Sequence, residues 1–202
     1  MGLFGGSTVA AIVLASTSSA RKRLLTEAGW SFEAVPSRID EGIDVDDPVE
    51  LVRTLAVRKA RAVAAQRPDA WVIGADQVVY DPGAREPWGK PPSDTAHLAR
   101  LQHLRGRRHE LVTGVALVRP EGVAVAHATS ALEMRADVSD EELEAYVACG
   151  EGRHCAGGYA VEGRGAFLFE RIDGDYTNVL GLPMPTLYGL LRDAGWRFGE
   201  GA

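Results

Sequence analysis

Short apolar runs that end abruptly in small or polar residues alternate along this 202-residue chain with segments whose apolar residues recur at helical spacing. Runs of the first kind are typical of buried strands, and they occur at 9–14, 31–36, 70–76, 112–118, 123–133 and 165–172. Helices are predicted from Ser18 or Ser19 to about residue 28, and at 48–66, 93–104, 139–150 and 185–194. This alternation, with a hairpin around "PEG" at 120–122, predicts an α/β fold with a mixed sheet flanked by helices.

Composition and charge narrow the class of protein. With 46% hydrophobic residues and no repeat or linker, residues 1–202 are expected to form a single domain, with residues 1–8 flexible. The net charge of −6 argues against a nucleic-acid partner, although a local pocket of cations can hold a small polyanion. Cys149 and Cys155 match no zinc spacing and are predicted to be free thiols. The run at 9–15 is too short to span a bilayer, so we expect a cytoplasmic protein with no membrane partner.

The stretch "VLASTSSARKRLL" at 13–25 places a Ser-rich turn between a strand and the start of a helix. Free amides of the first helical turn, small hydroxyls and the positive end of the helix dipole converge there, which makes a generic anion site. Arg21 adds a guanidinium suited to phosphate oxygens. The glycine patterns of Walker and dinucleotide-binding loops are absent. A simple helix cap remains the alternative for this turn.

Further polar residues stand where strands, helices and turns should present them. Glu41 lies in an acidic loop, Lys59 lies beside the apolar face of the predicted helix 48–66, Asp76 ends a strand-like run, and Lys90 lies in the "WGKP" loop. Taken singly, each has an ordinary structural alternative: a solvated loop, a lysine stem on apolar surface, a turn cap or plain surface. Together they offer two carboxylates that can hold Mg²⁺ and cations that can hold phosphates. These are the groups that phosphoryl transfer requires.

Over residues 13–196, approximately, the chain resembles the Maf nucleoside triphosphate pyrophosphatases. The blocks that carry the resemblance are "LASTSSARKRLL", "LAVRKA", "GADQ", "GKP", "LRGRRHELVTGV", "CAGGYAVEG" and "DGDYTNVLGLP". Their order and spacing are more specific than any single block. The resemblance implies an elongated, two-lobed fold of the inosine triphosphatase kind with a central cleft, and a homodimer. It also implies Mg²⁺-dependent hydrolysis of a nucleoside triphosphate to the monophosphate and pyrophosphate, with Mn²⁺ as a substitute, in the removal of non-standard nucleotides.

Position by position, the resemblance also implies roles for individual residues. Phosphate would be bound by Ser16, Ser18 and Arg21, and the catalytic residues would be Asp76, Glu41, Lys59 and Lys90. Among these, Glu41 and Asp76 would hold the metal, with Asp76 also the proton acceptor, and the two lysines would neutralise the triphosphate. His109 is instead predicted to be a hydrogen-bonded structural residue.

Three residues bear on the choice of base: Ala20, Gln77 and Glu162. Many relatives have "SPRR" where this chain has "SSAR", and a dTTP/UTP-preferring branch more often has Thr and Gln at positions 77 and 162. An ionised Glu162 only accepts hydrogen bonds, which suits the adjacent donors of guanine and the positive charge of 7-methylguanine. The sequence therefore predicts the 7-methyl-GTP branch, with CTP or UTP weaker and dTTP poor; a dTTP/UTP-preferring enzyme is the alternative.

A non-catalytic nucleotide sensor that regulates cell division is the contrasting hypothesis. Such a sensor would need the cations but no carboxylate that activates water. Asp76 therefore favours an enzyme. Nucleotidyl transfer would require an acceptor site, and the sequence offers none.

Overall fold

The computed structural model describes residues 11–83 and 87–197. The predicted flexible segment 1–8 lies outside these residues. A six-stranded mixed sheet forms the centre, with strand order β2-β1-β3-β4-β5-β6, which confirms the predicted α/β class. The strands are β1 (Ile12–Leu14), β2 (Glu33–Ala34), β3 (Trp71–Tyr80), β4 (Arg108–Arg119), β5 (Gly122–Met134) and β6 (Phe169–Asp173). β1 pairs with β2 and β3 in parallel, and the remaining pairs are antiparallel.

The helices flank this sheet. They are α1 (Ser19–Glu27), α2 (Pro48–Ala64), α3 (Asp94–Leu104), α4 (Asp140–Cys149), α5 (Tyr176–Val179) and α6 (Met184–Asp193), with short 3₁₀ turns at η1 (Glu151–His154) and η2 (Arg164–Leu168). Of these, α1, α3 and α4 begin at capping serines that the sequence indicates. Ser18 accepts a hydrogen bond from the Arg21 amide, and Ser139 forms the predicted capping box with Glu142. These caps satisfy amides that the helices cannot pair internally.

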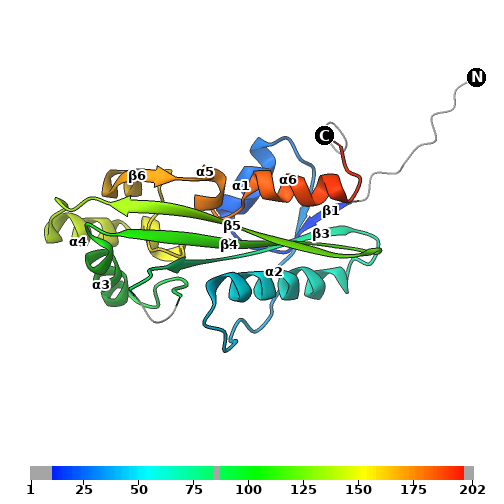
Figure 1. The fold of residues 1–202 in the computed structure, drawn as a ribbon, viewed down its shortest axis with the longest axis horizontal. Coiled ribbons are helices and arrows are strands. Elements are labelled where there is room, and N and C mark those ends of the chain that lie inside the picture. Colours follow the sequence, from blue (N-terminus) through cyan, green and yellow to red (C-terminus); the bar gives the residue numbers. More distant parts are fainter. Residues whose placement is uncertain (1–10, 84–86, 198–202) are drawn as a thin grey trace, which may run out of the picture.

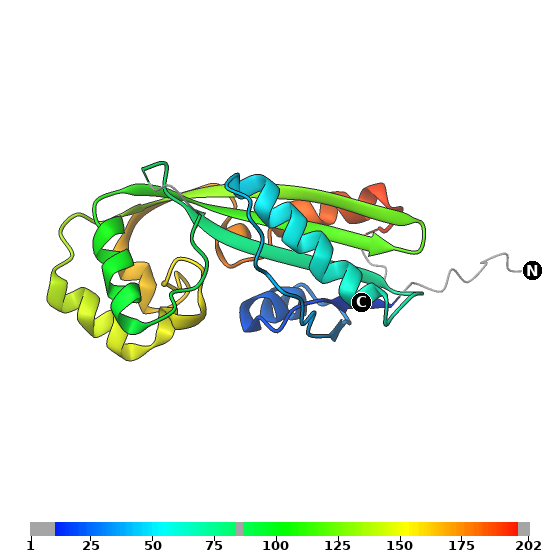
Figure 2. The ribbon, with the colours of Figure 1, turned by 90° about the horizontal axis from the view of Figure 1, so that it is seen from below.

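The long β4–β5 hairpin runs through the whole molecule, with α2 on one face of the sheet and α6 on the other (Figures 1 and 2). Successive side chains of a strand point to opposite faces, so β3 supplies both layers. Val72 packs with α2, whereas Ile73 packs with α1 and α6. Because both faces of the sheet are covered, most residues of β3 are apolar. At the far end of the molecule, α3 and α4 enclose a separate core against the ends of β3, β4 and β5.

Several predicted boundaries were wrong. The run 70–76 does not end at Asp76, since β3 continues to Tyr80 by pairing with β4. The segment 31–36 forms only the two-residue strand Glu33–Ala34. The strand predicted at 165–172 begins as a 3₁₀ turn and becomes β6 at Phe169. Tertiary pairing decides these boundaries, and local sequence carries little of that information.

His109 is a fully buried residue of β4, and its Nε2 lies 2.6 Å from the hydroxyl oxygen of Tyr159. Burial lowers the pKa of His109 from 6.5 to about 4. The unfolded chain therefore takes up a proton at a higher pH than the folded chain does. The free energy of unfolding should fall by about 3 kcal/mol as the pH drops from 6.5 to 4.

Urea unfolding at several pH values measures this loss. His109→Gln should flatten the pH dependence of the unfolding free energy between pH 6.5 and 4, because it removes the group that is protonated on unfolding. His127→Gln, at an exposed position of β5, should leave the dependence as it is in the parent protein. Identical slopes for the parent and the His109 variant would contradict the assignment.

Candidate active site

The Ser-rich turn follows β1 directly, where the parallel sheet ends. β1 pairs with β3 only as far as Ile73, so the following residues of β3 have no neighbouring strand on that side. The turn fills this place and is held by local hydrogen bonds. The buried Ser16 hydroxyl accepts a bond of 3.1 Å from the amide of Ser18. Small hydroxyls and the first turn of α1 thus stand at the carboxyl end of a parallel strand, a common ligand position in α/β proteins.

Arg21 connects this turn to two other parts of the chain. Its Nε donates to the carbonyl of Gly181 at 2.7 Å, and its Nη1 donates to the carbonyl of Ala75 at 2.8 Å. Burial lowers the pKa of Arg21, and the negative charges of Asp76 and Glu41 oppose that change. An arginine stays protonated in such surroundings, so a fixed cation lies beside the site.

Lys59 joins the two carboxylates for which the sequence predicts a metal-binding role. Its Nζ lies 2.6 Å from Asp76 Oδ1 and 2.8 Å from Glu41 Oε1. Strand alternation puts Asp76 on the same face of β3 as Gly74, toward α2, and Lys59 lies on the buried face of that helix. Lys59 and Asp76 are 8% and 7% exposed, whereas Glu41 is exposed. A largely desolvated ion pair is therefore open to solvent only at the Glu41 side.

Opposing influences act on the pKa of Asp76. Burial raises it, the charge and hydrogen bond of Lys59 and the charge of Arg21 lower it, and Glu41 raises it, with a net upward direction. A carboxylate with a raised pKa is more basic than an ordinary aspartate, which suits a group that must accept a proton from water.

The residues predicted to select the base lie in different surroundings. Gln77 lies on the opposite face of β3 from Asp76, and its Nε2 donates to Thr113 Oγ1 at 2.9 Å and to the Asn178 carbonyl at 2.7 Å. Both hydrogens of that amide are therefore used within the protein. Ala20 is half-buried in the first turn of α1, beside the Ser-rich turn.

Glu162 forms an ion pair that the sequence does not reveal, with 3.1 Å between its Oε1 and Arg23 Nη2. Lys90 is exposed, in the loop before α3. Burial is the largest of the causes that raise the pKa of the Cys155 thiol to about 11. The negative charge of Glu162 also raises this pKa, and the positive charge of Lys90 lowers it. Arg100 Nη1 donates to the carbonyls of Gly89 and Ala156, so the loop of Lys90 lies beside the loop that contains Glu162.

Sequence reasoning missed two parts of this arrangement. Arg23 is 139 residues from Glu162 in the chain, and no local pattern pairs them. The carbonyl of Gly181, which fixes Arg21, lies within the block "DGDYTNVLGLP", whose presence was the only available signal.

The donor set at Lys59 fits a hard divalent cation. Glu41 and Asp76 supply carboxylate oxygens that both lie within hydrogen-bond distance of Lys59 Nζ, so the two carboxylates are close to each other. In the part of the chain that the structure describes, no group of three or more His, Cys, Asp or Glu side chains could hold a metal. Two carboxylates suit Mg²⁺, which keeps several waters and binds substrate phosphates, better than a metal enclosed by protein ligands alone.

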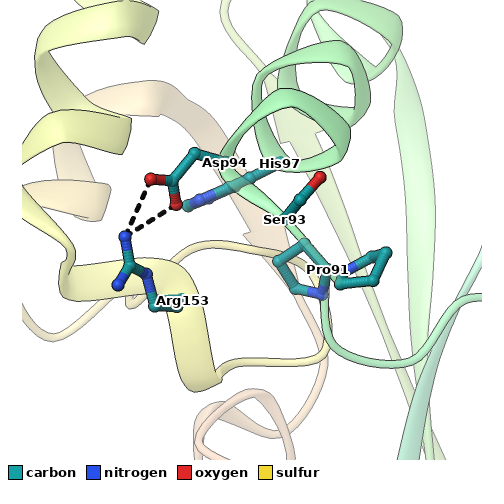
Figure 3. Close-up of a pocket in the computed structure, with 6 residues that line it drawn as sticks. Pro91, Ser93, Asp94, His97 and Arg153 are labelled. Carbon is teal, nitrogen blue, oxygen red and sulfur yellow. Dashed lines mark hydrogen bonds and ion pairs between the residues drawn. The ribbon is translucent and has the colours of Figure 1, made fainter.

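Two cavities among the described residues lie away from this site. One, of about 290 Å³, is formed by the loop that follows Lys90, the start of α3 and η1, with the ion pair between Asp94 and Arg153 beside it (Figure 3). The other, of about 300 Å³, lies along β6. Neither includes Asp76 or Lys59. We place the candidate site at the carboxylates and the Ser-rich turn, because the chemically competent groups converge there.

Comparisons with known proteins concern the family and the fold of the chain. The sequence model of the family described as "Maf-like protein" matches residues 11–194. A nucleoside triphosphate pyrophosphatase of Synechococcus sp. (strain JA-2-3B'a(2-13)) is 45% identical over 188 residues, 92% of this chain and 94% of that protein. A dTTP/UTP pyrophosphatase of Moorella thermoacetica is 45% identical over 189 residues, 91% of this chain and 95% of that protein.

Among solved structures, the Ham1 protein of Staphylococcus aureus is similar, with a TM-score of 0.51 and 18% identity, covering 91% of this chain and 99% of that one. At this identity the likeness concerns the fold alone. No helix among residues 11–83 and 87–197 is long and apolar enough to cross a membrane.

Proposed function

This chain belongs to the Maf-like protein family, and from that premise we propose that it hydrolyses a nucleoside triphosphate between the α and β phosphates, releasing pyrophosphate. The observation that carries the proposal is the convergence of Asp76, Glu41 and Lys59 on one point, close enough to Arg21 for their charges to interact. A relative 45% identical to this chain is named a nucleoside triphosphate pyrophosphatase, which supports the same reaction.

Each residue of the candidate site has a proposed role that follows from its chemistry. Ser16, Ser18 and the first amides of α1 bind phosphate oxygens. Arg21 contributes the one terminal nitrogen, Nη2, that makes no hydrogen bond among the described residues. Lys59 and Lys90 neutralise the triphosphate. Asp76 accepts a proton from the attacking water, a role that suits its raised pKa.

Magnesium is the cofactor we propose, with Mn²⁺ as a substitute, held by Glu41 and Asp76. Bound there, it would polarise the phosphoryl group and neutralise developing charge. The support is the pair of hard oxygen donors described above, which soft metals do not prefer. Activity should therefore be abolished by excess chelator and restored by Mg²⁺ or Mn²⁺; full activity in chelator would contradict the proposal.

For the base, we propose a preference for UTP and dTTP. The 7-methyl-GTP preference predicted from Glu162 required a free carboxylate, but Glu162 lies 3.1 Å from a guanidinium nitrogen. Two relatives, 45% and 41% identical to this chain, are named dTTP/UTP pyrophosphatase. Both observations support the pyrimidine alternative.

A triphosphate panel tests the reaction and the base together. The purified chain is incubated with UTP, dTTP, CTP, GTP and 7-methyl-GTP, and pyrophosphate and orthophosphate are measured separately. We expect pyrophosphate and nucleoside monophosphate in equal amounts, with UTP and dTTP the best substrates. Orthophosphate with a nucleoside diphosphate would overturn the cleavage site. Tight binding without cleavage would favour the nucleotide sensor.

The homodimer and the cytoplasmic location are proposals that rest on the family alone. Sedimentation of the purified chain tests the first, with a single species of twice the monomer mass as the expected result. A monomer at all concentrations would contradict it.

A further inference from the structure

Arg23 and Glu162 bring together two distant parts of the chain. Arg23 lies in α1, and Glu162 lies in the loop between η1 and η2. Their side chains are 44% and 28% exposed. An ion pair this open to solvent contributes little to the stability of a fold. The position of this ion pair, rather than its contribution to stability, therefore indicates its role.

That position is beside the candidate site. Arg23 is two residues from Arg21, in the helix whose first turn we assign to phosphate. Arg100 hydrogen-bonds to backbone carbonyls of both the loop of Lys90 and the loop of Glu162, so these loops lie side by side. The ion pair thus connects the helix of the Ser-rich turn with a loop that lies beside the loop of Lys90, the second predicted phosphate-binding lysine.

The pair also has a definite hydrogen-bonding character. One carboxylate oxygen of Glu162 faces Arg23 Nη2, and the other keeps its capacity to accept. The guanidinium retains further N–H groups beside it. Together the two side chains offer an acceptor and a donor next to each other, as a glutamine amide does. Uracil and thymine present a ring N–H flanked by carbonyls, which requires this combination.

The Gln77 amide, the other predicted contact to the base, is not available as a donor. Both hydrogens of the Gln77 amide are used, by Thr113 and by the carbonyl of Asn178. A lone carboxylate at Glu162 would accept from the base but donate nothing, and it would attract the positive charge of 7-methylguanine. The ion pair removes that attraction, because the guanidinium neutralises the carboxylate.

We propose that Arg23 is a specificity-determining residue, which pairs with Glu162 to form a composite donor and acceptor that selects neutral pyrimidine bases over cationic 7-methylguanine. The proposal rests on the function proposed above. Arg23 acts in part by positioning Glu162, so the effect of its removal depends on which side chain stands at position 162.

Removal of the guanidinium tests this. In Arg23→Ala, the ratio of kcat/KM for UTP to that for 7-methyl-GTP should fall by about tenfold. A site discriminates strongly between substrates only while its own polar groups are hydrogen-bonded to the preferred one. Arg23→Lys should restore part of the ratio, because it keeps a charge and a donor but loses the planar fork. An unchanged ratio in Arg23→Ala, within twofold, would overturn the proposal.

The double variant Arg23→Ala/Glu162→Gln separates a specific role from a structural one. Glutamine supplies both a donor and an acceptor, so the ratio should return toward its original value although Arg23 is still absent. A further fall below the single variant would overturn the proposal. Glu27→Gln is the matched control. It removes the other carboxylate near Arg23, 3.7 Å from Nε, and should leave the ratio unchanged.

Binding of the products gives a readout that does not require hydrolysis. Calorimetric dissociation constants for UMP and 7-methyl-GMP should change in the same ratio in Arg23→Ala. If the parent chain releases no pyrophosphate from any triphosphate, the proposed function fails, and the binding ratio still decides the role of Arg23. Equal binding ratios for the parent and the variant would refute that role.

Discussion

Asp76→Asn is expected to lower the rate of pyrophosphate release by about 100-fold or more, with the fold intact. Asparagine keeps the shape of the side chain but loses the charge that holds a cation and accepts a proton. Lys59, which lies 2.6 Å from this carboxylate, would keep only Glu41 as an anionic partner. Release of pyrophosphate by the purified variant, measured under saturating UTP and Mg²⁺, gives the effect on kcat.

The structure offers a matched control for this variant. Asp81 is also a buried aspartate, directly after β3, and its Oδ2 lies 2.6 Å from His103 Nε2. It contacts neither Lys59 nor Glu41, so Asp81→Asn should keep kcat within a few-fold of the parent value. Near-normal turnover of Asp76→Asn would exclude Asp76 as the proton acceptor. Loss of turnover in both variants to the same degree would point to a general effect on folding.

Gly74→Ala is expected to destabilise the protein by about 3 kcal/mol or more, because α2 lies directly on this position. A Cβ atom at Gly74 would lie 2.2 Å from the carbonyl oxygen of Ala56 and 2.8 Å from the amide nitrogen of Ala60. Both are backbone atoms of α2, so the clash with the added Cβ can be removed only if the whole helix shifts. Since Lys59 lies between these two alanines, the shift should also reduce catalysis.

Urea unfolding of the variants measures this effect. Gly189→Ala serves as the control, because Gly189 is an exposed residue of α6 with nothing within 4 Å of an added Cβ. There alanine should stabilise the helix by about 0.5–1 kcal/mol. If Gly74→Ala unfolds within 1 kcal/mol of the parent protein, the close approach of α2 to β3 is not the constraint we infer.

The close contact at Gly74 explains why the site forms where it does. β3 extends past the end of its parallel neighbour β1, and α2 crosses its surface at the same point. A helix this near to a strand places Lys59 within 2.6 Å of Asp76. The Ser-rich turn follows the end of β1, so the groups that we propose to bind phosphate lie together with the carboxylates at one edge of β3.

The prediction of the base depended on a contact between distant parts of the chain, which the sequence does not show. Treated alone, Glu162 is a free anion, and a free anion favours a cationic base. In the fold, Arg23 lies beside it. Gln77 presents a similar case, since its amide is directed toward Asn178, 101 residues away. Partners so far apart in the chain leave no local signal, and their charges and hydrogen bonds change what each side chain offers to a ligand.

Local sequence patterns were enough to predict most of the elements, three helix caps and the family. Apolar periodicity predicted the strands and helices, Ser18, Ser93 and Ser139 indicated three helix starts, and the order of the blocks indicated the Maf-like family. Only the tertiary structure decided that β3 continues past Asp76, that Lys59 bridges two carboxylates and that Arg23 pairs with Glu162. Periodicity and capping depend on neighbours within a few residues, whereas charge pairing and burial depend on which distant segments the core brings into contact.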